Sequence, residues 1–156
     1  MTKKERYEAF LPQLAALIEG EHDETAVMAN TSAALATEFK WFWTGFYVVR
    51  DGELLLGPFQ GTVACMHIGF GRGVCGSAWK EGRTLVVPDV EEFPGHIACS
   101  SLSRSEIVVP IFDGSEVRAV LDIDSTELAT FDETDREYLE RVARLIASQV
   151  YTRVLS

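Results

Sequence analysis

Apolar residues recur at helical spacing in two segments near the start of the chain. In the first segment they are Tyr7, Phe10, Leu11, Leu14, Leu17 and Ile18. Thr2 and Glu5 can form a capping box that begins this helix, and Gly20 marks its end. Pro12 lies inside the pattern and predicts a kink or a split, because proline has no N–H to donate. An alanine-rich segment from Asp23 to about Phe39 predicts a second helix. Its core-facing positions would be Val27, Met28, Ala34 and Leu35.

Two hairpins are predicted further along the chain. WFWTGFYVV (41–49) is rich in aromatic and β-branched residues, and an Asp-Gly turn signal leads from it into ELLLGPF. SEIVVPIF (105–112), a second Asp-Gly turn and EVRAVLDIDS (116–125) predict another hairpin. Between the hairpins, residues 61–103 are irregular and rich in glycine, apart from the strand-like TLVVPDV.

A third helical pattern ends the chain and completes the predicted fold. Asp132 is its expected N-cap. Its apolar stripe consists of Leu139, Val142, Ile146, Val150 and Val154. Helices at both ends of two hairpins indicate an α+β fold, with one antiparallel sheet and helices packed on one face. We expect one domain over residues 1–156.

Composition and charge exclude several classes of function. Hydrophobic residues make up 47% and charged residues 24%, which is typical of a globular protein. A formal charge of −10 disfavours nucleic acid and anionic membrane surfaces as partners. No apolar run approaches the roughly 18 residues of a membrane span, and the charged first residues do not resemble a secretory signal. Three cysteines, an odd number, favour free thiols in a reducing compartment, so we expect a cytoplasmic protein.

The segment GRGVCG (71–76) matches the G-x-G-x-x-G pattern of dinucleotide-binding proteins. That site needs a preceding strand and a following helix of a βαβ unit, and only a few residues separate Gly76 from the next glycine, Gly82. We therefore interpret the segment as a tight glycine-rich loop. Its inward N–H groups could hold a small carboxylate.

The cysteines and two histidines are the next candidates for chemistry. They occur as Cys65-x-His67, Cys75 and His96-x-x-Cys99. Sulfur and nitrogen ligands can bind zinc, but structural zinc sites usually contain close C-x-x-C pairs, which this chain lacks. Cys75 lies between Val74 and Gly76 and could be a buried, inert thiol. Cys65 and Cys99 have polar or flexible neighbours, where a thiol is accessible.

Three carboxylates belong to the second hairpin. Asp122 and Asp124 alternate with large apolar residues in VLDIDS, so both lie on one face of their strand. Glu106 begins the partner strand. Acidic residues on a strand are often simply solvated, but three of them on paired strands make a compact anionic subsite that suits an ammonium ion.

Together these residues favour reduction of a small amino-acid sulfoxide. A thiolate attacks the sulfoxide sulfur, and the oxygen must be protonated or strongly hydrogen-bonded as it leaves, which yields a cysteine sulfenic acid. A second thiol then forms a disulfide that an external dithiol reduces. Three cysteines suffice for this cycle, and the aromatic strand could hold a methyl group.

These segments resemble the free methionine-(R)-sulfoxide reductases, which have a GAF-type domain. The resemblance covers about residues 40–126 and includes the spacing C-x9-C-x23-C. It rests on WTGFY, GPFQG, AC, GRGVCG, DV…FPGHIAC, SEIVVPI and LDIDS, in this order.

The resemblance implies a role for each candidate residue. Cys99 would be the attacking cysteine, Cys65 the principal resolving cysteine and Cys75 an auxiliary one. Trp43 and Tyr47 would line the substrate site, with Trp43 against the methyl-thio end. The ammonium group and the polarised sulfoxide would be held by Glu106, Asp122 and Asp124. The resemblance also implies free methionine-(R)-sulfoxide as substrate, thioredoxin as reductant, no metal or bound cofactor, and a possible homodimer.

Two positions depart from the family pattern. Ala119 stands where glycine is frequent, and Ser100 follows Cys99 where an acidic residue is common. Neither change removes a catalytic group, and an uncharged Ser100 disfavours the thiolate less than an acid would. The alternative functions are a non-catalytic GAF domain that senses a small ligand and a zinc-binding module.

Overall fold

The amino-terminal helices form as the sequence predicts, with one exception. In the computed structural model, which describes residues 1–96 and 99–151, α1 spans Lys3–Ile18 and α2 spans Glu24–Phe39. The Thr2–Glu5 capping box is present. Pro12 lies within one continuous α1, so the predicted split is wrong. Buried residues on both sides of Pro12 anchor this helix to the core and offset the one lost N–H bond.

The strands form one antiparallel sheet in the order β3-β2-β1-β6-β5-β4. Both predicted hairpins are confirmed, and they pair with each other through β1 and β6. The strands are β1 Trp43–Arg50, β2 Glu53–Gln60, β3 His67–Gly69, β4 Leu85–Val87, β5 Ser105–Asp113 and β6 Glu116–Ser125.

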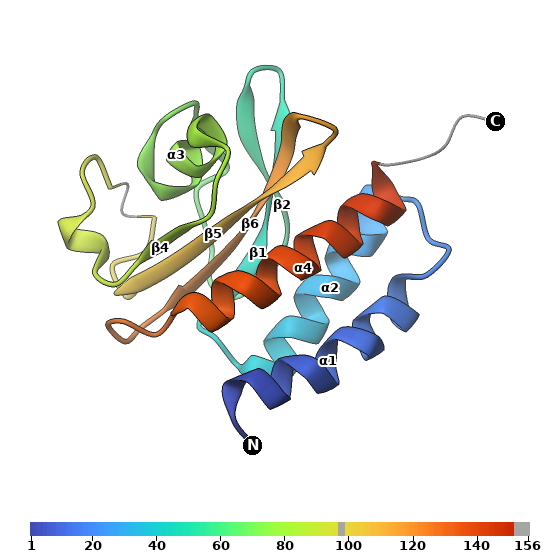
Figure 1. Ribbon diagram of the computed structural model, residues 1–156. Helices are drawn as coiled ribbons and strands as arrows, with labels where there is room; N and C mark the ends of the chain where they lie inside the picture. Colours follow the sequence, from blue (N-terminus) through green and yellow to red (C-terminus); the bar gives the residue numbers. More distant parts are fainter. Residues whose placement is uncertain (97–98, 152–156) are drawn as a thin grey trace.

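Three helices cover one face of this sheet. α2 and the carboxy-terminal helix α4, Glu133–Val150, pack on the sheet itself, and α1 packs against α2 and α4 (Figure 1). Asp132 caps α4 by accepting the backbone N–H of Thr134 at 2.9 Å. The buried Asp135 ties α4 to α1, because it accepts the Tyr7 hydroxyl at 2.6 Å and the Lys3 ammonium at 2.7 Å. Val154, the last residue of the predicted stripe, lies outside the described residues.

The opposite face carries the short helix α3, Gly73–Glu81, which the sequence did not predict (Figure 1). Val74, Cys75 and Ala78 of α3 pack on this face in a second hydrophobic cluster. The expectation of helices on one face alone is therefore wrong. A 3-10 turn, Val90–Glu92, follows β4 on the way to β5.

The glycines of GRGVCG serve the packing of α3. A Cβ at Gly76 would lie 2.5 Å from the carbonyl oxygen of Gly69, so only glycine permits this close approach to β3. β3 pairs antiparallel with β2, and every strand pairing of the described sheet is antiparallel. The segment therefore lacks the parallel βαβ unit of a dinucleotide site, but it begins a helix rather than forming the loop we expected.

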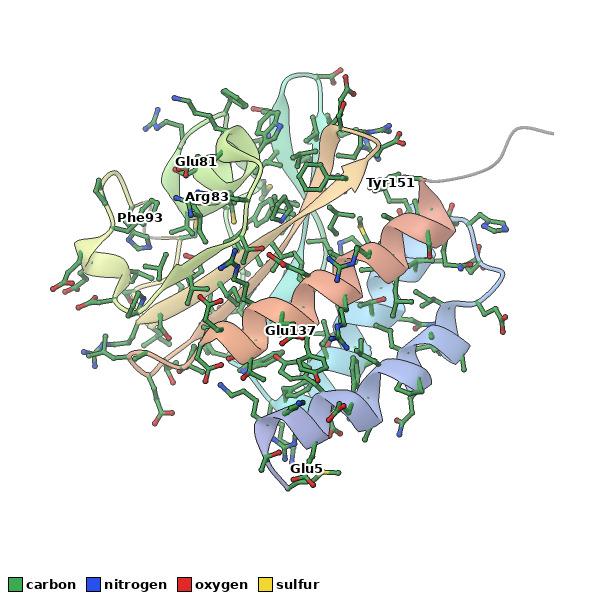
Figure 2. All side chains as sticks on the ribbon, in the orientation of Figure 1. Glu5, Glu81, Arg83, Phe93, Glu137 and Tyr151 are labelled. Carbon is green, nitrogen blue, oxygen red and sulfur yellow. A yellow bond between two sulfur atoms is a disulfide. The ribbon has the colours of Figure 1, made fainter. Side chains whose placement is uncertain are left out.

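Many of the charged side chains lie on the outside of the molecule. Glu5, Glu81, Arg83 and Glu137 are exposed and project from the ribbon (Figure 2). Arg83 pairs with Glu81 at 2.7 Å. Among the residues that the structure describes, no helix has the length and apolar character needed to cross a membrane.

Candidate active site

The three predicted carboxylates meet on the face of the sheet that α3 covers. Glu106 of β5 lies directly opposite Asp124 of β6, and Asp122 is two residues along on the same face. Large apolar residues between them, such as Ile123, point to the other face and into the first core cluster. Glu106 is 7% and Asp122 6% exposed. The period-two prediction therefore holds, and the acids do not lie on a solvated face, since Glu106 and Asp122 are buried and Asp124 is partly buried.

Strand β1 places aromatic side chains beside these acids. Trp43 pairs with Asp124 and Gly45 with Asp122 across the β1–β6 ladder. Tyr47 follows on the same face. Trp43 and Tyr47 are 4% and 2% exposed. Gly45 allows Phe59 of β2 to pack closely against this strand, since a Cβ at Gly45 would lie 2.3 Å from Cβ of Phe59. This strand thus gives the acidic site an apolar wall.

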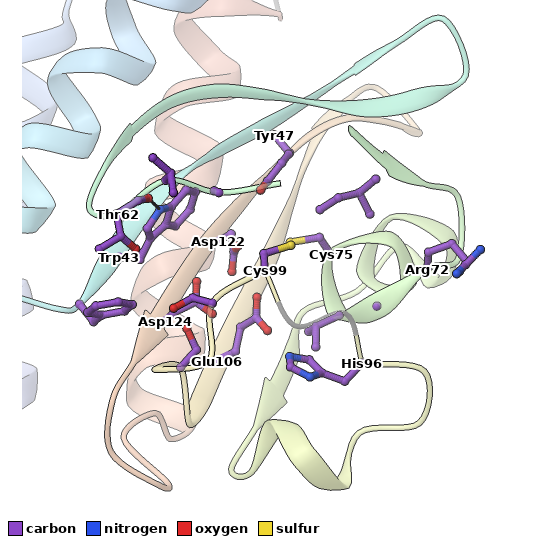
Figure 3. Close-up of a pocket in the computed structure, with 18 residues that line it drawn as sticks. Trp43, Tyr47, Thr62, Arg72, Cys75, His96, Cys99, Glu106, Asp122 and Asp124 are labelled. Atoms are coloured by element: carbon purple, nitrogen blue, oxygen red, sulfur yellow. Dashed lines mark hydrogen bonds between the residues drawn. The ribbon is translucent and has the colours of Figure 1, made fainter. Parts of the chain in front are cut away.

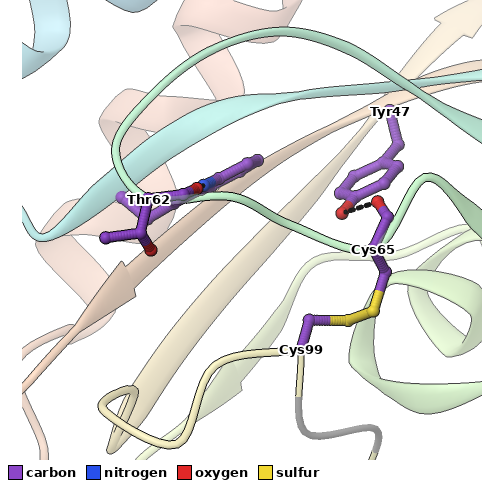
Figure 4. The surroundings of a disulfide bond; sticks show 5 residues. Tyr47, Thr62, Cys65 and Cys99 are labelled. Carbon is purple, nitrogen blue, oxygen red and sulfur yellow. Dashed lines mark hydrogen bonds between the residues drawn. A yellow bond between two sulfur atoms is a disulfide. The ribbon is translucent and has the colours of Figure 1, made fainter.

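Both aromatic residues also hold the loop that carries Cys65. The indole N–H of Trp43 donates to the carbonyl of Thr62 at 2.9 Å, and the hydroxyl of Tyr47 donates to the carbonyl of Cys65 at 2.8 Å (Figure 4). A buried aromatic residue with a polar group usually finds such a partner. The position of Cys65 is therefore fixed by two residues of the candidate site itself.

Cys65 and Cys99 form a disulfide across the site, with their Cα atoms 5.4 Å apart (Figure 4). Cys65 belongs to the loop after β2, and Cys99 belongs to the loop before β5. Both residues are partly exposed. The two thiols that the sequence placed in accessible loops thus come together although 34 positions separate them.

Cys75, the third cysteine, remains a thiol and is buried on α3. Its sulfur and one oxygen each of Glu106 and Asp122 all lie within 4.8 Å of one another. Figure 3 shows Cys75 and Cys99 at the cavity that Glu106, Asp122 and Asp124 also line. This closeness depends on α3 and was not predicted.

Burial dominates the electrostatics of the acidic group. It raises the pKa of Glu106 well above its usual range, and the nearby carboxyls of Asp122 and Asp124 raise it further. Burial also raises the pKa of Asp122 and, well above the usual range, that of Asp124. The pKa of the Cys75 thiol is raised well above normal, again mainly by burial and then by these acids. The folded protein therefore binds protons at these three carboxyls more tightly than the unfolded chain does.

A cavity of about 60 Å³ joins these groups. Seven of the eight predicted site residues line it, and Cys65 reaches it through the disulfide. The sequence did not assign Phe42, Thr62, Ile68, Arg72, Val74, Ser100 and Ser103 to the site, although they also line the cavity. His96, one of the histidines that the sequence offered as candidates for chemistry, also lines the cavity (Figure 3). For most of these additional lining residues, the only feature of the sequence that could have indicated a place in the site was a position close to Trp43, Cys75 or Cys99.

The mixed cysteine and histidine set considered for zinc does not assemble among the described residues. Cys65 and Cys99 are bonded to each other. His67 lies at an exposed position of β3, where its Nδ1 is 2.6 Å from Oε1 of Glu53. The donor atoms that do converge are those of Cys75, Glu106 and Asp122.

Comparison with known proteins gives a consistent set of relatives. The GAF domain family model matches residues 21–149. GAF domain-containing protein A of Dictyostelium discoideum is 53% identical over 93% of this chain and 92% of its own length. The free methionine-R-sulfoxide reductase of Saccharomyces cerevisiae is 42% identical over 94% of this chain and 86% of its own. The crystal structure of the free methionine-R-sulfoxide reductase of Neisseria meningitidis with its substrate superposes with a TM-score of 0.94, at 52% identity over 96% of this chain and 90% of that one.

Proposed function

The chain belongs to the GAF domain family as a close relative of the free methionine-R-sulfoxide reductases, and we propose that it reduces free L-methionine-(R)-sulfoxide to methionine. The observation that carries this proposal is the Cys65–Cys99 disulfide above a buried acidic and aromatic pocket. A ligand-sensing domain has no need for an oxidisable cysteine pair at its ligand site.

The pocket has the chemistry to recognise a free amino acid. The carboxyls of Asp122, Asp124 and Glu106 provide acceptors for an ammonium group, which a methionine residue inside a protein lacks. None of the ion pairs in the described residues involves these three carboxyls. The substrate's ammonium therefore meets acids that have no competing cation bound to them. Trp43 offers an apolar surface to the methyl-thio end.

The first chemical step transfers the sulfoxide oxygen to Cys99. The Cys99 thiolate attacks the sulfoxide, the sulfur–oxygen bond of the substrate breaks, and Cys99 becomes a sulfenic acid while methionine leaves. The oxygen needs a proton, and Glu106 or Asp124 can supply it because burial raises the pKa of both. The substrate's positive charge offsets these acids and favours the thiolate when substrate is bound.

The second step converts the sulfenic acid into the disulfide seen here. The Cys65 thiol attacks the Cys99 sulfur, the new sulfur–sulfur bond forms and water leaves. An external dithiol, for which we propose thioredoxin, then donates two electrons and two protons to restore both thiols. Cys75 can resolve the sulfenic acid only as an auxiliary, because burial raises the pKa of its thiol and disfavours the reactive thiolate.

The test is consumption of substrate by purified protein with dithiothreitol. We expect loss of free L-methionine-(R)-sulfoxide, little loss of the S epimer, and none with methionine sulfoxide inside a peptide. Cys99→Ser should abolish turnover and retain binding. Wild-type protein that binds the free sulfoxide but does not consume it would instead support the non-catalytic sensor.

A further inference from the structure

The buried side of the pocket brings together three potential metal donors. The sulfur of Cys75 and one oxygen each of Glu106 and Asp122 come from three different elements, α3, β5 and β6, and lie within 4.8 Å of one another. The donors of a tetrahedral zinc ion lie about 3.3–3.7 Å apart, as follows from its usual bond lengths. Small side-chain rotations would therefore bring all three atoms onto one ion.

A second observation at this position is an unpartnered acceptor. Oδ1 of Asp122 is buried and finds no hydrogen-bond partner among the residues that the structure describes, while Asp122 as a whole is 6% exposed. Such an oxygen favours binding of a donor or a cation, because it has lost water without replacement. The cavity of about 60 Å³ beside it can hold an ion together with a water molecule as fourth ligand.

We propose that a thiophilic divalent cation of the zinc class binds to Cys75, Glu106 and Asp122 in this pocket. One thiolate and two carboxylates suit such an ion better than they suit magnesium or calcium, which prefer oxygen donors alone. Binding displaces the thiol proton, together with any proton held by the two carboxyls, and these protons go to solvent.

This cation would compete with the substrate. The same two carboxyls are assigned to the substrate's ammonium, so metal and substrate would exclude each other and the metal-bound protein would be inactive. This part of the inference rests on the proposed function, whereas the metal site itself does not.

The disulfide form of the protein provides a clean test of the site. With Cys65 and Cys99 bonded, Cys75 is the one thiol left among the three cysteines of the chain. Cadmium chloride, titrated into this form without reductant, should produce the ultraviolet charge-transfer band of a cadmium–thiolate bond, which saturates at one ion per chain. Zinc chloride should displace cadmium and abolish the band, and magnesium should not.

Variants assign the donors. Cys75→Ser should lose the band, and Asp122→Asn, which keeps the thiol, should weaken cadmium binding by about tenfold or more. His67→Ala removes a histidine on the surface and should leave binding unchanged. Circular dichroism verifies that each variant folds. The metal site is refuted if wild-type protein gives no band, if the band survives in Cys75→Ser, or if Asp122→Asn binds as tightly as wild type.

Free methionine tests the competition separately. It should raise the apparent dissociation constant for cadmium in proportion to its concentration. If cadmium binds at one ion per chain and methionine has no effect on that binding, the metal and the substrate do not share these carboxyls. That result would refute the proposed position of the substrate's ammonium group, and the metal site would stand.

Discussion

The buried acids lead to a prediction about stability: Glu106→Gln should make the folded protein more stable near pH 8. Glu106 and Asp122 lie almost wholly out of water, and their raised pKa values mean that the folded chain holds protons more tightly than the unfolded chain does. In the unfolded chain these carboxyls have pKa values of about 4. The free energy of unfolding of the wild type must therefore fall as the pH rises above about 4, and it must continue to fall until the pH reaches the raised pKa values of the folded protein. Glutamine does not titrate, so its variant should show a shallower decline.

The distance between the acids sets the size of the effect. One carboxylate oxygen of Glu106 and one of Asp122 lie within 4.8 Å of each other. Two full charges at that distance repel each other by about 3.5 kcal/mol at an effective dielectric constant of about 20. Bound protons relieve part of this repulsion in the wild type. Glutamine also brings an N–H donor close to the unpartnered Oδ1 of Asp122. We therefore expect a gain of about 1–3 kcal/mol in the free energy of unfolding near pH 8, and little difference near pH 4.

Urea denaturation of the disulfide form at several pH values measures this gain. Glu116→Gln is the matched control, because it makes the same substitution at an exposed position of β6. It removes one negative charge from the surface and leaves the buried acids unchanged. The control should follow the wild-type curve to within about 0.5 kcal/mol. If Glu106→Gln is no more stable than wild type near pH 8, or declines as steeply with pH, the reasoning about buried charge is wrong.

Three further predictions concern catalysis and packing. Glu106→Gln combined with Asp124→Asn should slow sulfenic acid formation at saturating substrate by about 100-fold or more, measured by rapid-quench trapping, because the leaving oxygen loses its proton donors; an unchanged rate would exclude both residues as donors. Tyr47→Phe removes the hydroxyl that fixes the loop of the resolving cysteine, so disulfide formation should slow by about 3–10-fold while the first burst of methionine stays the same. Gly45→Ala should lower the free energy of unfolding by about 1–3 kcal/mol, because its Cβ would meet Phe59 at 2.3 Å; thermal denaturation at wild-type stability would contradict this packing.

The sequence predicted the parts of the fold that rest on long, regular patterns. Alternation in VLDIDS was enough to place Asp122 and Asp124 on one face, and the turn signals were enough to predict both hairpins. Helix α3 has no such pattern. It is nine residues long and contains Gly73 and Gly76, which have low helix propensity, so contacts with the sheet stabilise it.

The missed helix also limited what could be predicted about the site. Cys75 approaches Glu106 and Asp122 only because α3 lies across the sheet, so its place among the acids had no signal in the sequence. The pairing of Cys65 with Cys99 followed from the family resemblance and not from spacing. Two loops far apart in the sequence bring these cysteines together, and no local pattern encodes that contact.

The most direct test of the central claim is a single turnover without reductant. Fully reduced protein, mixed with excess free L-methionine-(R)-sulfoxide, should release about one methionine per chain, and mass mapping of the product should join Cys65 to Cys99 in one peptide pair. Cys65→Ser should still release that one methionine, and the sulfenic acid on Cys99 should persist longer than in wild type, because only the buried auxiliary Cys75 is left to resolve it. Failure to release methionine, or a full burst from Cys99→Ser, would contradict the account.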